Sequence, residues 1–70
     1  MPTTAIRHAY YRPESATLDL TFVTGRRYRY FAVPPAVAEG FAAARSKGGY
    51  FNRRIRDRFA FDELEPEGES

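Results

Sequence analysis

The sequence has no cysteine and only one histidine, His8. The absence of cysteine excludes disulfides, iron–sulfur clusters and cysteine-based zinc sites. A histidine that stands alone does not make a zinc site either, so we expect no metal ion and no cofactor. No stretch approaches the roughly 18 consecutive apolar residues of a membrane span, and we therefore expect no membrane partner.

Groups that would catalyse a reaction are not assembled in the sequence. Asp19, Glu39 and Asp57 stand singly, so they do not form a pair of catalytic carboxylates. Ser46 and Lys47 are adjacent, but neighbours at a helix end do not meet in the geometry of a nucleophile and its base, and helix capping explains them. We expect no catalytic residue and no enzyme. The first residues lack the basic and apolar regions of a secretory signal peptide, so we expect a cytoplasmic location.

The chain is rich in aromatic residues and in unevenly distributed charge. Its 70 residues include six Phe and five Tyr, the large side chains with which a single small domain builds a core. The formal net charge is only +2. Residues 1–61, however, carry eleven Lys and Arg against four acidic residues, a net +7, whereas residues 62–70 carry five acidic residues and no basic one, a net −5. A basic body of this kind favours an anionic partner.

Apolar periodicity predicts three strands and then two helices. Strict alternation over residues 17–23 indicates a half-buried strand, and aromatic segments at 6–11 and 26–33 flank it across short turns. Two apolar stripes at helical spacing follow over residues 35–46 and 50–59; their members are Val37, Phe41 and Ala44 in the first, and Phe51, Ile55 and Phe59 in the second. Ser46-Lys47-Gly48-Gly49 is expected to end the first helix, with glycine at a left-handed cap.

These elements predict an α+β domain over residues 1–61. Its sheet is a three-stranded antiparallel β-meander, followed by an αα-hairpin packed on one sheet face, in the order β-β-β-α-α. Residues 62–70 are acidic and nearly without apolar side chains, so we expect a disordered tail. The tail either stays solvated or folds back over the basic body as a competitor of nucleic acid, and a chain that ends after Phe61 distinguishes the two.

Three segments resemble the KTSC domain family: residues 28–34 (YRYFAVP), 46–52 (SKGGYFN) and 55–59 (IRDRF). The resemblance extends over residues 6–61 in pattern. The family is named for the C-terminus of certain lysyl-tRNA synthetases and also occurs as free-standing bacterial proteins of about this length. The resemblance implies that the whole chain up to Phe61 is one domain. Attachment to a synthetase implies RNA binding but names no activity.

The first group of candidate binding residues lies in the third predicted strand, where arginines interleave with aromatic residues: Arg26, Tyr28, Arg29 and Tyr30. In RNA recognition on open sheets, aromatic rings stack on unpaired bases while guanidinium groups neutralise phosphates. The strand register decides whether Tyr28 and Tyr30 face solvent or pack in the core, and the sequence leaves both arrangements open.

The second group surrounds the turn between the helices and consists of Lys47, Gly48, Gly49, Asn52, Arg53 and Arg56. Two glycines just before the second helix would leave backbone N–H groups free at its N-terminus, where the helix dipole favours an anion such as phosphate. The alternative is a plain turn between two helices and a solvated basic helix, with Arg53 and Asp57 forming an i,i+4 pair.

The sequence thus predicts a non-enzymatic domain that binds nucleic acid, RNA or tRNA rather than DNA, through a basic surface rich in Tyr and Arg. The alternative is a protein–protein interaction module or a homodimer. Arg and Tyr are also typical of protein interface hot spots, and an unpaired sheet edge can dock a partner.

Overall fold

The strand β2 (Thr17–Phe22) lies at the centre of the sheet and carries the core, as its alternation predicts. Leu18 and Leu20 are 2% and 0% exposed, and Phe22 continues the same row. Asp19 lies between the two leucines in sequence and therefore projects from the opposite face. The structure is a computed structural model that describes residues 5–66.

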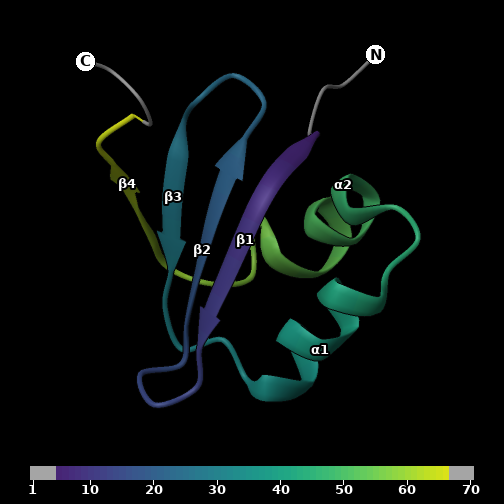
Figure 1. The fold of residues 1–70 in the computed structure, drawn as a ribbon. Coiled ribbons are helices and arrows are strands. Elements are labelled where there is room, and N and C mark those ends of the chain that lie inside the picture. The colour runs from purple at the N-terminus through teal and green to yellow at the C-terminus, as the bar shows by residue number, and fades with distance from the viewer. Residues whose placement is uncertain (1–4, 67–70) are drawn as a thin grey trace.

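The sheet has four antiparallel strands in the order β1-β2-β3-β4, and the helical segments lie on one of its faces (Figure 1). The other three strands are β1 (Ile6–Arg12), β3 (Arg27–Tyr30) and β4 (Phe61–Leu64). The α+β class is confirmed, but the predicted number of three strands is wrong. Among the described residues, no helix is long and apolar enough to cross a membrane.

The additional strand β4 begins at Phe61 and pairs with the free edge of β3, where Phe61 lies opposite Tyr30 and Asp62 opposite Arg29. Residues 62–64, which the sequence assigned to a tail, therefore belong to the folded domain, and the predicted boundary after Phe61 is too early. Residues 65 and 66 follow β4 without regular secondary structure, and the last part of that tail, residues 67–70, lies outside the described residues. A chain that ends after Phe61 would lose most of a strand as well as the tail.

The predicted third strand is shorter than residues 26–33, because the backbone turns immediately after Tyr30. Ala32 has a positive φ of 57°, which ends the extended conformation. The turn places Val33 in the core, fully buried, with its backbone N–H donating to the carbonyl oxygen of Ala16 at 2.8 Å. The hydroxyl of Tyr11 donates to the Val33 carbonyl at 2.6 Å. Both hydrogen bonds tie the end of β3 to the β1–β2 hairpin.

The helical layer consists of α1 (Pro35–Ala43), the short α2 (Lys47–Tyr50) and the π-helix η1 (Phe51–Ile55), which continues α2. Phe41, Phe51 and Ile55 are buried against the sheet, which confirms the predicted apolar stripes at these positions. The predicted helices over residues 35–46 and 50–59 are too long at their ends, so that Ala44 and Phe59 lie beyond α1 and η1. The wider turn of η1 is closed by a hydrogen bond from Arg56 N to the carbonyl of Phe51, five residues earlier, at 2.8 Å. Such π segments recur at functional sites.

The segment between the helices differs from its prediction. Gly48 and Gly49 lie inside α2 and not at a left-handed cap of α1. Ser46 caps the start of α2, where its Oγ accepts from the N–H of Gly49 at 3.1 Å. Lys47 donates from Nζ to two carbonyl oxygens at the end of α1, each at 3.1 Å. Capping therefore accounts for both residues, but they cap different helices.

Candidate functional site

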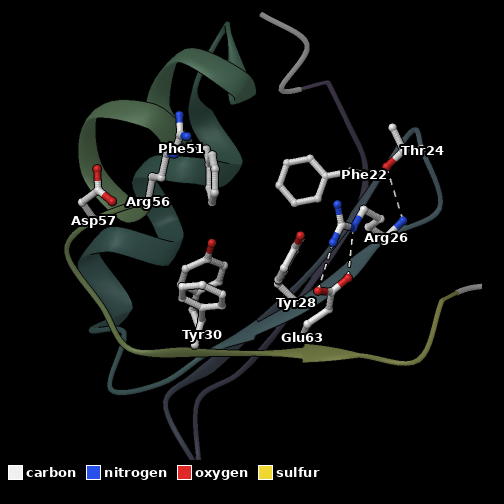
Figure 2. A pocket seen from close by; sticks show the side chains of 10 residues that line it. Phe22, Thr24, Arg26, Tyr28, Tyr30, Phe51, Arg56, Asp57 and Glu63 are labelled. Atoms are coloured by element: carbon white, nitrogen blue, oxygen red, sulfur yellow. Dashed lines mark hydrogen bonds and ion pairs between the residues drawn. The ribbon is translucent and has the colours of Figure 1, made fainter.

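Five aromatic side chains form a closed ring on the helical side of the sheet. Each ring contacts the next at centroid distances between 5.2 and 5.7 Å, in the order Phe22, Tyr28, Phe61, Tyr30, Phe51 and back to Phe22. They line a groove of about 690 Å³ between η1 and the β3–β4 edge (Figure 2). This volume lies within the range of roughly 300–1,000 Å³ that is typical of small-ligand sites. We call it the aromatic groove.

The strand register explains how the two tyrosines reach this groove. Tyr28 lies opposite Leu20 and Tyr30 opposite Leu18, so both tyrosines share the face that carries the core. The arrangement in which they form an open stacking platform on the free face of the sheet is therefore wrong. Tyr30 is 3% exposed and Tyr28 is half-buried. Their hydroxyl groups point into the groove (Figure 2).

Tyr30 is the more deeply buried of the two tyrosines, and its hydroxyl has no hydrogen-bond partner among residues 5–66. No hydrogen bond within residues 5–66 involves this oxygen, although the ring is almost completely enclosed. Burial, reinforced by the neighbouring Tyr28, raises the pKa of Tyr30 to about 12. The hydroxyl therefore stays protonated and keeps its capacity to donate a hydrogen bond into the groove.

The rim of the groove is polar and carries charges of both signs. Arg26 donates from Nε and Nη2 to the two carboxylate oxygens of Glu63, at 3.0 and 3.2 Å, and this pair raises the pKa of Arg26. Arg56 and Asp57 contribute one further charge of each sign from the end of η1. Two arginines face two carboxylates, so the rim as a whole has no net formal charge.

The opposite, uncovered face of the sheet carries a separate ion-pair network centred on Asp19. Its carboxylate accepts from Arg29 at 2.8 and 3.0 Å and from Arg12 at 2.8 Å. The hydrogen bonds from Arg29 and Arg12 lower the pKa of Asp19, although partial burial opposes them, and Asp19 in turn raises the pKa of Arg29. The guanidinium of Arg12 also lies 4.8 Å from the ring centre of Tyr10. Arg12 and Arg29 on this face therefore share one carboxylate as their ion-pair partner.

The last part of the helical layer differs in this respect. Four exposed arginines lie within η1 or just after it. We call them the η1 arginines: Arg53, Arg54, Arg56 and Arg58. Within residues 5–66, no salt bridge joins any of them to a carboxylate. Arg56 donates to the side-chain oxygen of Asn52 at 3.3 Å, and this partner is an uncharged amide. The predicted i,i+4 pair between Arg53 and Asp57 is absent among these residues.

A comparison with known proteins agrees with this architecture. The KTSC domain profile matches residues 2–59. This chain belongs to the KTSC family. The crystal structure of a KTSC domain protein from Yersinia pestis superposes with a TM-score of 0.85 at 26% identity, and the match covers 93% of this chain and 92% of that one.

Two relatives show the settings in which the KTSC domain occurs. A lysine–tRNA ligase of Nostoc punctiforme is 41% identical over 59 residues, which are 84% of this chain but 10% of the ligase. A protein of Tsukamurella paurometabola is 39% identical over 57 residues, which are 81% of this chain and 85% of that protein. The chain thus spans about a tenth of the length of the ligases that it matches.

The structure divides the predicted binding residues of this KTSC domain among several places. Arg26, Tyr28, Tyr30 and Arg56 come together at the aromatic groove. Arg29 lies on the opposite face with Asp19. Asn52 and Arg53 are exposed on η1. Lys47, Gly48 and Gly49 do not form a phosphate cradle, because Ser46 already occupies the N–H of Gly49 and Lys47 is engaged by carbonyl oxygens.

Sequence reasoning missed several groove residues: Phe22, Thr24, Phe51, Asp57, Phe61 and Glu63. Phe22 and Phe51 were predicted as core side chains, and only the tertiary structure shows that their rings also reach a groove. Phe61 and Glu63 were missed together with β4. Among the described residues, no group of three His, Asp or Glu side chains is placed to hold a metal ion.

Proposed function

We propose that this KTSC domain binds single-stranded RNA without catalysing a reaction, and that the η1 arginines hold the phosphates. The observation that carries the proposal is that four neighbouring arginines are exposed without a carboxylate partner in residues 5–66. Charges left unpaired on one surface attract a polyanion, and arginine matches the geometry of phosphate oxygens. Arg56 belongs both to this surface and to the groove rim, so the two features adjoin.

Two further features favour RNA as the polyanion. Sequence-specific or sequence-tolerant recognition of single-stranded RNA combines aromatic rings with basic side chains, and the aromatic groove lies directly beside the η1 arginines. The relatives named lysine–tRNA ligase carry a matching segment. A protein of that name handles a tRNA, and an attached domain that contacts RNA would be useful there.

The test compares two variants that remove the same charge from different faces. One is the triple variant Arg53→Ala, Arg54→Ala and Arg58→Ala on the helical layer; the other is Arg12→Ala, Arg27→Ala and Arg29→Ala on the uncovered sheet face. Fluorescence anisotropy with labelled single-stranded RNA at several salt concentrations measures the slope of log affinity against log salt. Because each phosphate contact contributes about 0.7 to this slope on a single strand, we expect the first variant to reduce it by about 2.

The second variant is expected to change the slope less, because Arg12 and Arg29 are held in ion pairs with Asp19 and Arg27 donates to the backbone carbonyl of Glu65. Circular dichroism confirms that both variants are folded. Equal slopes for the two variants would show that only net charge matters and would contradict a binding role for the η1 surface. If the unmodified domain binds no RNA and light scattering shows a stable dimer, the interaction module becomes the better interpretation.

A further inference from the structure

The buried tyrosine of the aromatic groove has a donor that the fold does not use. The side chain of Tyr30 is only 3% exposed. Its hydroxyl nevertheless points into the groove and makes no hydrogen bond within residues 5–66 (Figure 2). No side-chain polar atom of the described residues is both buried and without a partner, so the Tyr30 oxygen itself must be accessible from the groove, although the rest of the side chain is enclosed. The groove around it is large enough for a small ligand, which would supply the missing partner.

The walls and the rim of the groove restrict the chemistry of that ligand. Five aromatic rings line the groove, and the two of them that are not buried, Tyr28 and Phe61, offer ring surface on which a flat ligand can stack. At the rim, Arg26 and Arg56 are balanced by Asp57 and Glu63. A site without net charge favours an uncharged ring over a free cation or anion. The polar rim and the Tyr30 hydroxyl additionally require hydrogen-bonding groups on the ring edge.

We infer that the aromatic groove binds one unpaired nucleobase. A nucleobase is flat and uncharged, and its edge carries hydrogen-bond donors and acceptors. Its sugar and phosphates would extend from the groove past Arg56 toward the other η1 arginines, which is where unpaired positive charge lies. The inference rests on the proposed function, which it deepens by assigning a separate place to the base.

Two groove residues have different roles in this arrangement. The Tyr30 hydroxyl donates to a ring nitrogen or a carbonyl oxygen of the base. Phe61 is 50% exposed at the open side of the groove and offers its ring for stacking. Because Phe61 stands on the outer strand β4 and half of its surface is in contact with solvent, its truncation leaves the core of the fold in place.

The experiment titrates the full chain with the uncharged nucleosides adenosine, guanosine, cytidine and uridine, and with ribose 5-phosphate as a probe that has no base. Backbone amide signals in heteronuclear NMR spectra report the site. We expect the nucleosides at millimolar concentration to shift the signals of Thr24, Tyr28 and Glu63, and ribose 5-phosphate to leave them unchanged.

Three variants connect these shifts to the groove. Tyr30→Phe removes only the hydroxyl, so we expect the dissociation constant of the best nucleoside to rise about 2- to 12-fold. Phe61→Ala removes a stacking surface, and a rise of about 5- to 150-fold is expected. Tyr10→Ala is the matched control, since Tyr10 is equally exposed, at 55%, but belongs to the opposite face of the sheet. It should not change the dissociation constant.

The results separate this inference from the proposed function. If no nucleoside shifts the groove signals, or if ribose 5-phosphate shifts them as strongly, the groove does not bind a nucleobase. The proposed function would survive that result as long as RNA binding still depends on Arg53, Arg54 and Arg58. The opposite outcome is also informative. If nucleoside binding depends on Tyr30 and Phe61 but RNA affinity is unchanged in the triple arginine variant, the groove binds a base and the η1 arginines do not bind phosphate.

Discussion

Two groups of arginines have a similar density in the sequence but differ in what faces them in the structure. The β3 arginines, which are Arg26 just before the strand and Arg27 and Arg29 within it, lie next to strands that carry Asp19, Asp62 and Glu63. Arg26 and Arg29 form bidentate ion pairs with Glu63 and Asp19, and Arg27 donates to the backbone carbonyl of Glu65. None of the η1 arginines forms a salt bridge with a carboxylate of the described residues.

The difference shows that the density of basic residues is a poor guide to a polyanion-binding surface. Ion pairs on a protein surface contribute little to stability, but they remove charge that would otherwise attract phosphate. Neighbouring strands place Asp19 and Asp62 opposite Arg29, and they bring Glu63 within hydrogen-bond distance of Arg26. The solvent side of a helical segment has no such neighbour, so the η1 arginines keep their charge.

The largest effect is expected from a substitution that loosens the layer carrying the η1 arginines. Phe41→Ala removes a ring that is 2% exposed and that packs between α1 and the sheet. The lost burial and the cavity left behind should lower the free energy of unfolding by about 3–5 kcal/mol, measured by urea denaturation. Tyr10→Ala on the uncovered face should change it by no more than about 0.5 kcal/mol. A near-neutral result for Phe41→Ala would mean that the helical layer is not packed on the sheet.

An intermediate effect is expected when the charge of paired arginines is released. Asp19→Asn removes the carboxylate that engages Arg12 and Arg29. Both guanidinium groups then become available to phosphate, and the slope of log RNA affinity against log salt should steepen by up to about 1.4. Glu14→Gln is the matched control, because it removes the same charge from an exposed turn residue. If the two variants have the same effect, local pairing does not explain the contrast between the two groups.

The smallest effect concerns the stability of the Asp19 network in acid. The two arginines lower the pKa of Asp19 below its ordinary value of 3.8 in the folded state. The unfolded chain therefore takes up this proton first as the pH falls, so the stabilisation is complete above 3.8 and is lost as the pH falls through the folded-state value. Thermal unfolding between neutral and acidic pH should show this loss in the unmodified domain, and a smaller loss in Asp19→Asn. Parallel pH profiles would contradict the role of Asp19.

Local patterns predicted the elements that depend only on spacing. The alternation around Leu18 and Leu20 identified β2, and the helical spacing of Phe51 and Ile55 identified the buried side of the second helical segment. These predictions are confirmed because burial of one face imposes a period of two on a strand and of about 3.6 on a helix. The same patterns carry no information on the wider turn of η1, and the prediction of an ordinary helix over residues 50–59 missed it.

The candidate site was predicted only in part, because its members depend on contacts between distant segments. Arg26 and Glu63 are separated by 37 residues, and nothing near Glu63 in the sequence indicates that it belongs to a strand. Asp62 precedes it and Glu65 follows two positions later, and acidic residues disfavour a strand when considered alone. The free edge of β3 overcomes the low strand propensity of this segment. It supplies backbone hydrogen bonds to β4, and Arg26 beside it forms an ion pair with Glu63.

By itself, the sequence determined a small α+β domain with a central alternating strand, an apolar helical layer, abundant aromatic rings and an excess of basic residues before Phe61. Only the tertiary structure decided which arginines keep their charge, on which side of the sheet Tyr28 and Tyr30 lie, and that Phe61 closes a ring of aromatic side chains with them. The physical reason is that periodicity and composition are properties of neighbouring residues, whereas ion pairing, register and a groove arise where β4 and η1 meet a strand far from them in the chain.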